Sequence, residues 1–229
     1  ALAAVTALPA AAFADNHEDM AKVRVGHFSP DAPAVDVYAN GGAILEDVAF
    51  GALSPYLPVP GGTYTIEVVV ADADPADGAV IGPIDLDFAA GTMTTVAATN
   101  FVESIEAKVL QDDPMPQDGI AQVRVIHFSA DAPAVDIAFD GGDVVVPELA
   151  YPNAAGYLDL PEGEYDLEIR VAGTDQVAFD IPPLTLDGNN SFSVFAIGSL
   201  ADESFAVLPA LDASADMDEM GEDEEMAEE

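Results

Sequence analysis

Residues 21–36 read AKVRVGHFSPDAPAVD, and residues 121–136 read AQVRVIHFSADAPAVD. The two stretches are identical at 13 of 16 positions and differ only at 22/122, 26/126 and 30/130. Self-similarity at a fixed offset indicates a repeated structural unit rather than an isolated motif. The 229 residues therefore contain two domains. Each has roughly 90 residues, near the lower end of the size at which one hydrophobic core is sufficient.

Strand patterns dominate each repeat. Residues 63–71 (TYTIEVVVA) and 164–172 (EYDLEIRVA) alternate apolar with polar side chains, which is the period of a half-buried strand. Asn40-Gly41-Gly42 and Asp140-Gly141-Gly142 follow apolar runs, where glycine supplies the positive φ of a tight hairpin. Short strands between frequent turns, without helical periodicity, predict an all-β chain of two tandem immunoglobulin-like antiparallel β-sandwich domains.

The same patterns predict the boundaries of the domains. We place sandwich repeat 1 at 21–113 and repeat 2 at 121–211, with linkers at 15–20 and 114–120. Residues 212–229 contain ten acidic residues and no basic one, and such a tail is expected to be disordered. Residues 1–14 resemble the end of a secretory signal peptide, with Ala12-Phe13-Ala14 as the cleavage pattern. We therefore expect a secreted, periplasmic or cell-surface protein.

The charge balance limits the partners of the chain. Acidic residues outnumber Lys and Arg by 43 to 5, which gives a net charge of −38. This field repels phosphate backbones, which excludes nucleic acid, and it attracts cations. Self-repulsion weakens a fold most at low salt, because the Debye length falls from about 30 Å at 0.01 M to about 3 Å at 1 M salt. We therefore expect halophilic adaptation. Beyond the first residues, no apolar run is long enough to span a bilayer.

Two stretches in each repeat carry a family resemblance. Residues 23–42 (VRVGHFSPDAPAVDVYANGG) and 57–71 (LPVPGGTYTIEVVVA), with 123–142 (VRVIHFSADAPAVDIAFDGG) and 158–172 (LDLPEGEYDLEIRVA), resemble the domain-of-unknown-function 4397 family (DUF4397). The resemblance implies an exported or cell-surface β-sandwich, commonly in tandem, and supplies no catalytic residue. The second copy departs from the first at Ala130, which replaces Pro30 and removes no functional group.

The shared motif is interpreted as a strand, a turn and a second strand. Period two places Val23, Val25 and His27 on one strand face. The polar residues of the motif are interpreted as scaffold: histidines that donate to a turn carbonyl, aspartates that cap the turn, and Arg–Asp pairs across strands. In chain order these residues are Arg24, His27, Asp31 and Asp36 in the first copy, and Arg124, His127, Asp131 and Asp136 in the second.

A catalytic or a transition-metal site is the alternative to this interpretation. His27, Ser29 and Asp31 as base, nucleophile and acid would need converging hydrogen bonds, whereas strand neighbours two apart point in parallel. The sequence has no G-x-S-x-G pattern. Three histidines without cysteine fall short of the usual ligand sets, although His27 with Asp31 and Asp36 stays open. We therefore predict no enzymatic activity and no resident cofactor.

Calcium is the stronger metal candidate, because it prefers oxygen ligands. Asp72, Asp74 and Asp77 cluster in one loop, but their spacing departs from the EF-hand pattern. The matching loop of the second repeat has only Asp175, so a calcium site would belong to the first repeat alone. A solvated loop is the favoured interpretation, with calcium as the alternative.

Tyrosines recur at matching places in the two repeats, at Tyr56, Tyr64, Tyr157 and Tyr165. Tyrosine on sandwich strands is most often a core residue whose hydroxyl bonds to a turn backbone. A sugar-binding platform of exposed rings is the alternative.

The sequence thus predicts an exported, non-enzymatic module. We expect it to act in cell-envelope or extracellular-matrix structure or in adhesion, by contact with an envelope, matrix or surface component and with cations. Duplication adds contact area and effective concentration. A calcium- or carbohydrate-binding module is the alternative.

Overall fold

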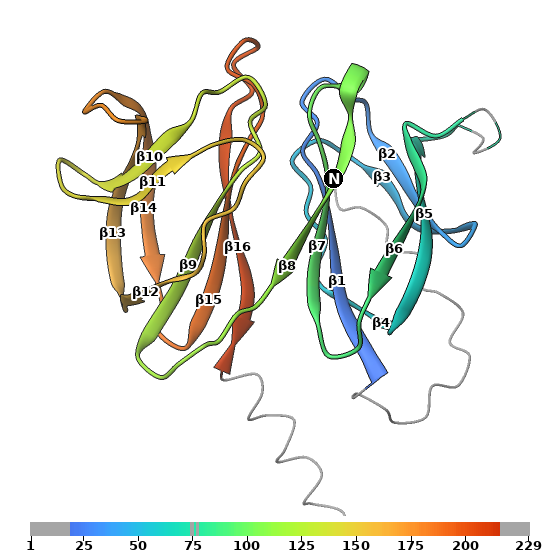
Figure 1. Ribbon diagram of the computed structural model, residues 1–229, viewed down its shortest axis with the longest axis horizontal. Helices are drawn as coiled ribbons and strands as arrows, with labels where there is room; N and C mark the ends of the chain where they lie inside the picture. Colours follow the sequence, from blue (N-terminus) through green and yellow to red (C-terminus); the bar gives the residue numbers. More distant parts are fainter. Residues whose placement is uncertain (1–18, 74–75, 77, 216–229) are drawn as a thin grey trace, which may run out of the picture. The chain divides into compact units, whose positions relative to one another are not determined.

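A computed structural model describes residues 19–73, 76 and 78–215 of the chain. These residues form two compact units that divide between Asp113 and Pro114; the part before this boundary is unit 1 and the part after it is unit 2. Each unit contains two four-stranded sheets (Figure 1). The prediction of an all-β chain with two sandwich domains is confirmed, and the immunoglobulin-like type stays a prediction. Within the described ranges, no helix has the length and apolar character needed to cross a membrane.

Unit 1 is built from strands β1 to β8. Its first sheet has the strand order β4 (Leu57–Pro60), β1 (Met20–His27), β7 (Met93–Thr99) and β8 (Glu106–Asp112). Its second sheet has the order β3 (Gly42–Val48), β2 (Val35–Ala39), β5 (Gly62–Val70) and β6 (Ile81–Phe88). A short 3₁₀ helix, η3 (Val102–Ser104), lies between β7 and β8.

Unit 2 repeats this topology with strands β9 to β16. Its first sheet has the order β12 (Leu158–Pro161), β9 (Ile120–His127), β15 (Asn190–Ile197) and β16 (Ala206–Ser214). Its second sheet has the order β11 (Val144–Leu149), β10 (Val135–Phe139), β13 (Gly163–Val171) and β14 (Val177–Leu186). The two halves of the shared motif thus belong to different sheets, and its turn joins them.

One strand pair in each unit is parallel. β1 pairs with β7, where Lys22 lies beside Met93, and β9 pairs with β15, where Gln122 lies beside Ser191. All other strand pairs are antiparallel. The antiparallel sandwich expected from the sequence thus contains a parallel pair in each unit. The pairing joins strands separated by five others, which no local pattern in the sequence reveals.

The core of each unit lies between its two sheets. In unit 1 it includes Val35 and Val37 of β2, Ile66 and Val68 of β5, and Ala98 of β7. In unit 2, Val123 of β9, Ile137 of β10 and Leu167 of β13 belong to the equivalent cluster. Since both sheets contribute, each unit is closed by burial of apolar side chains between them.

Strand β13 differs from its prediction on its second face. Glu168 and Arg170 were expected on a solvated face, yet both are buried. They form an ion pair at 2.5 Å, and Arg170 Nη2 also donates to the carbonyl of Gly142 at 3.0 Å. A charged pair can be buried in this way because its charges are mutually compensated and hydrogen-bonded.

The predicted turn chemistry is confirmed in the first hairpin. Asn40 has φ 50° and Gly41 has φ 78°, between the paired residues Ala39 and Gly42. Two left-handed residues in a two-residue hairpin loop match the right-handed twist of the flanking strands.

The first strands of the two units are packed differently on one face. A Cβ placed on Gly26 would lie 2.7 Å from the ring of Phe28, so a side chain here would require that ring to move. Its counterpart in unit 2 is Ile126, which is fully buried. There the ring of Phe128 stacks on Phe195 with a centroid distance of 6.3 Å.

The end of the second repeat was placed too early. β16 continues to Ser214, and Asp212, assigned to the acidic tail, is a buried strand residue. An acidic residue beside a run of acids gives no local signal of burial. Residues 216–229 of the predicted tail and the predicted signal segment 1–14 lie outside the described residues.

Candidate functional site

The motif histidines bond to the turn that follows them. His27 Nε2 lies 3.0 Å from the carbonyl oxygen of Pro33, and His127 Nε2 lies 3.1 Å from that of Pro133. A carbonyl can only accept, so Nε2 carries the proton in both rings. Burial lowers the pKa of each ring below its usual value, against the opposing effect of this hydrogen bond. Both imidazoles are therefore neutral at neutral pH and serve to hold the turn.

The first motif aspartate ties the turn to the loop after β7 or β15. Asp31 accepts a hydrogen bond from the Val102 backbone N–H at 2.7 Å. In unit 2, Asp131 accepts bonds from the N–H groups of Leu200 and Ala201, at 3.0 and 2.9 Å, and from the Ser199 hydroxyl at 2.8 Å. Burial acts to raise the pKa of Asp131, but these three bonds outweigh it and hold the pKa below its usual value. These aspartates cap a loop distant in sequence, not only their own turn.

The second motif aspartate caps a bulge on the neighbouring strand. Asp36 Oδ1 accepts the N–H of Asp47 at 2.8 Å, and Asp136 Oδ1 accepts that of Glu148 at 2.7 Å. Asp47 and Glu148 have φ of 55° and 50°, beside register shifts in the pairs β2–β3 and β10–β11. The bonds from Glu148 and then Gly173 lower the pKa of Asp136. Each aspartate thus stabilises a left-handed residue that the bulge requires.

The motif arginines lie in a buried network that is repeated in both units. We call it the Arg–Asp network; it comprises Arg24, Tyr56, Thr95 and Asp112 in unit 1, and Arg124, Tyr157, Ser193 and Asp212 in unit 2. Arg24 is 1% exposed and Arg124 is 4% exposed.

In unit 1, Arg24 Nε donates to Thr95 Oγ1 at 2.8 Å, and Thr95 donates to Asp112 Oδ2 at 2.5 Å. The hydroxyl of Tyr56 donates to the same carboxylate oxygen at 2.7 Å, and its ring lies 4.6 Å from the Arg24 guanidinium. Stacking and hydrogen bonding together compensate a charge that burial would otherwise penalise.

In unit 2 the distances are nearly the same. Arg124 Nε donates to Ser193 Oγ at 2.7 Å, and Ser193 and Tyr157 each donate to Asp212 Oδ2 at 2.6 Å. Arg124 Nε also lies 3.9 Å from Asp212 Oδ2. The predicted pairs Arg24–Asp36 and Arg124–Asp136 were wrong, because each arginine lies in the first sheet and each aspartate in the second.

The catalytic alternative finds no support in the contacts of its residues. His27 bonds to Pro33 and Asp31 to the Val102 backbone. The Ser29 hydroxyl is buried and has no hydrogen-bond partner among the described residues. Nucleophile, base and acid therefore do not form the converging chain that a triad needs.

His27, Asp31 and Asp36 bond to three different places: the motif turn, the loop after β7 and the bulge of β3. Across the described ranges, no group of three His, Asp or Glu side chains is arranged to hold a metal ion. Of the predicted calcium loop, Asp72 has φ 64°, and Asp74 and Asp77 lie outside the described residues. The calcium site therefore stays a prediction.

Two of the four recurring tyrosines bond as predicted. The hydroxyl of Tyr64 donates to the carbonyl of Pro60 at 2.8 Å, and that of Tyr165 to Pro161 at 2.7 Å. Tyr56 and Tyr157 bond instead to the carboxylates of the Arg–Asp network. The carboxylates lie some 55 residues away in the chain, so local sequence reasoning could not identify them.

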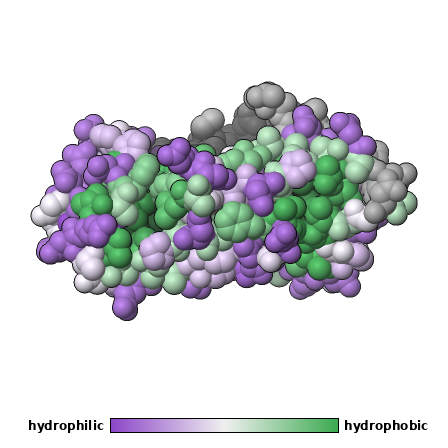
Figure 2. Space-filling model, turned by 90° about the horizontal axis from the view of Figure 1, so that it is seen from above, coloured by the Kyte–Doolittle hydropathy of each residue, from purple (hydrophilic) through white to green (hydrophobic). Residues whose placement is uncertain are grey.

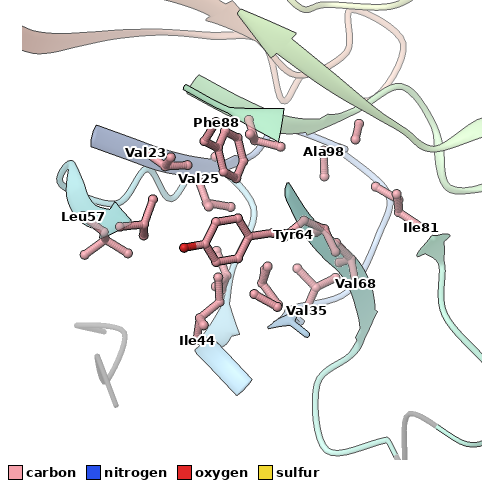
Figure 3. Close-up of a pocket in the computed structure, with 18 of the residues that line it drawn as sticks. Val23, Val25, Val35, Ile44, Leu57, Tyr64, Val68, Ile81, Phe88 and Ala98 are labelled. Carbon is pink, nitrogen blue, oxygen red and sulfur yellow. The ribbon is translucent and has the colours of Figure 1, made fainter. Parts of the chain in front are cut away.

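Unit 1 also contains an apolar cavity between its sheets. Its volume is about 280 Å³, and Tyr64 lies in the middle of its labelled lining residues (Figure 3). The lining comes from all eight strands, β1 to β8, of both sheets and includes Val23, Val37, Ile44, Leu57, Val68 and Phe88. Such a space, enclosed by side chains with few polar groups, suits an apolar ligand. Sequence reasoning missed the cavity.

The comparisons with known proteins place the chain in a family. A family model described as "Domain of unknown function (DUF4397)" matches residues 21–138 and 121–220. No curated protein matches the chain.

Among solved structures, the Bacillus anthracis TIE protein is 12% identical with a TM-score of 0.26. The match covers 79% of this chain but only 34% of that one. A structure titled "Alpha-glucan binding by a streptococcal virulence factor" is 13% identical with a TM-score of 0.26. Here the match covers 80% of this chain and 95% of that one. These likenesses are too low for any residue role to be transferred.

Proposed function

The chain belongs to the DUF4397 family, in two copies. On that basis we propose that it is an exported, non-enzymatic module that acts in cell-envelope or extracellular-matrix structure or in adhesion. It would work by surface contact with an envelope or matrix component, and two copies would raise the effective concentration of contacts.

One observation carries the proposal: the histidine, aspartate and arginine side chains that the repeats share are bonded within the scaffold. His27, Asp31 and Asp36 bond to backbone groups of their own unit, as do their counterparts in unit 2. The arginines are engaged in the Arg–Asp network. These residues therefore stabilise each sandwich, and this role is enough to explain why both repeats contain them.

The apolar residues exposed on the surface support a role in contact with a partner. On the face shown in Figure 2, apolar patches lie among hydrophilic residues. Several apolar side chains are exposed, with 37% to 51% of their surface accessible: Val102, Val109, Val144, Val177, Leu200 and Leu211. With a net charge of −38, close approach to an anionic envelope would require salt or bridging cations.

The test is co-sedimentation of the purified full chain with envelope fractions from the source cells, at about 0.1 M and about 1 M salt. We expect saturable retention that increases with salt, and no release of soluble products over time. An unrelated protein of similar negative charge serves as the control for non-specific retention.

Absence of saturable retention at both salt concentrations would overturn the proposal. So would time-dependent release of envelope fragments, because that outcome would indicate an enzyme.

A further inference from the structure

At a position that lines the cavity of unit 1, unit 2 has a much larger side chain. Ala39 pairs with Ile66 across β2 and β5, and its counterpart Phe139 pairs with Leu167 across β10 and β13. The ring of Phe139 stacks on Tyr165 at a centroid distance of 6.0 Å. In unit 1 the equivalent tyrosine, Tyr64, faces the cavity instead (Figure 3).

Other lining positions differ in size in both directions. Unit 2 has the larger residue at the pairs Val37/Ile137, Val68/Ile169 and Ala107/Val207, whereas unit 1 has the larger one at Phe88/Leu186 and Ile44/Val145. The exchange of alanine for phenylalanine dominates, because it is by far the largest change in side-chain volume. Since protein interiors are normally packed without voids larger than a water molecule, the open space in unit 1 calls for an occupant.

The lining defines the chemistry of that occupant. Among the residues that the structure describes, no Lys, Arg, Asp or Glu lines the cavity, and its polar members are His27, Asn40 and Tyr64. The Tyr64 hydroxyl bonds to the Pro60 carbonyl, and His27 Nε2 bonds to Pro33. Burial lowers the pKa of His27, so the ring adds no charge at neutral pH. An ionised ligand would lose its hydration here without gaining a counter-charge.

The size of the cavity limits the ligand further. An engineered cavity of about 150 Å³ lined by Leu, Ile and Phe stays dry and binds benzene. The cavity of unit 1, at about 280 Å³, has nearly twice that volume.

We propose that unit 1 binds an uncharged, apolar small molecule of roughly ten carbon atoms between its sheets, and that unit 2 does not. Tyr64 and Ala39 form the part of the site in which the two units differ most. The inference goes beyond the proposed surface role and does not depend on it.

The test uses naphthalene, an uncharged probe of this size, and 1-naphthoate as its anionic counterpart. The full chain has no Trp, so the naphthalene fluorescence is not obscured by indole emission. We expect saturable binding of one naphthalene per chain and at least tenfold weaker binding of naphthoate. Ala39→Phe, which introduces the residue of unit 2, should weaken naphthalene binding at least tenfold.

Matched variants keep this test decisive. Phe139→Ala lies in unit 2 and should leave the unit 1 site at unchanged affinity. Should Ala39→Phe lose the β-sheet circular dichroism of the wild type, the milder pair Val68→Ile with Ala107→Val replaces it and should weaken binding in the same direction.

Any of three results would overturn the inference: no saturable naphthalene binding by the wild type, unchanged binding by a folded cavity-filling variant, or loss of binding in Phe139→Ala. Equal affinity for naphthalene and naphthoate would contradict the assignment of an uncharged ligand.

Discussion

Units 1 and 2 have the same topology and the same Arg–Asp network, but they differ in how the space between their sheets is filled. Unit 1 has Ala39 and an open cavity, whereas unit 2 has Phe139 stacked on Tyr165. The difference shows that the motif of residues 21–36 and 121–136 determines the scaffold and leaves the interior free to diverge. If so, damage to the shared network should affect both units alike, and changes in the core should affect them differently.

The largest expected effect comes from the shared network. Arg24→Met leaves the Asp112 carboxylate buried without its cation, which should cost unit 1 about 3–5 kcal/mol. Arg124→Met should cost unit 2 a similar amount, because its network has nearly the same geometry. Urea unfolding at fixed salt, followed by circular dichroism, measures both losses.

The double variant Arg24→Met with Asp112→Leu is the control. It removes both charges and should be more stable than Arg24→Met alone. A single arginine variant within about 1 kcal/mol of the wild type would show that the network is not a shared support.

Exchanging the core residues at positions 39 and 139 should change the stability of the two units by different amounts. Phe139→Ala removes a half-buried ring from unit 2 and should cost about 2 kcal/mol, less than the roughly 3–5 kcal/mol of a fully buried phenylalanine. Ala39→Phe fills existing space in unit 1 and should cost less than about 1 kcal/mol or stabilise it. Urea unfolding of the two variants measures the asymmetry. Equal losses in both would mean that unit 1 has no space beside Tyr64.

The tyrosine hydroxyls should again behave alike in the two units. Tyr64→Phe and Tyr165→Phe each remove one hydrogen bond to a proline carbonyl and should each cost about 1 kcal/mol. Tyr38→Phe is the control, because within the described part of the chain no hydrogen bond of the Tyr38 hydroxyl is found. Thermal unfolding measures both losses, and a loss of stability in only one of the two variants would contradict the prediction.

The buried histidines should make both units sensitive to mild acid. Burial lowers the pKa of His27 and His127 in the folded state, so the unfolded state binds protons first. The stability contributed by the neutral histidines is fully present above their pKa in the unfolded state, about 6.5. It is lost as the pH falls through their lowered pKa values in the folded state. Thermal unfolding between about pH 7.5 and 5 measures it. His27→Gln should remove the dependence from unit 1 alone, and a pH profile identical to the wild type would contradict this.

Calcium should produce the smallest effect and in unit 1 only. The acidic loop with Asp72, Asp74 and Asp77 occurs in the first repeat, and the second has Asp175 alone. We expect saturable binding of Ca²⁺ at about millimolar affinity in calorimetric titration. Asp72→Asn should abolish it and Asp175→Asn should not. Binding that both variants retain would assign the ion to general screening of negative charge.

Much of the fold could be predicted from the sequence because its signals are local. Period two identified β5 and β13, and Asn40-Gly41 identified the hairpin between β2 and β3. The bond from Tyr64 to Pro60 spans only four residues, so it too follows from local pattern.

The Arg–Asp network and the cavity could not be predicted from local signals. Asp112 meets Thr95 through the antiparallel pair β7–β8, but it meets Tyr56 only because β1 pairs in parallel with β7, which joins β7 and β8 to the sheet of β4 and β1. Asp36, which shares the motif with Arg24, passes to the other sheet through the turn. For the cavity, one signal was available: alignment of the repeats places Ala39 opposite Phe139, a change too large for two equally packed cores.

The glycine beneath Phe28 has a consequence for how a duplicated chain assembles correctly. β1 pairs with β7 across a sequence separation of 71 residues. Because β9 has nearly the same sequence as β1, each of these first strands competes during folding for the strand that pairs with the other, β7 or β15. Gly26 lies beside Ala97, and Ile126 lies beside Phe195. Two small residues are therefore neighbours in the first sheet of unit 1, and two large residues are neighbours in the first sheet of unit 2. An exchanged pairing would bring Phe195 beside a strand whose space Phe28 already fills, so we expect this one substitution between the copies to disfavour strand swapping.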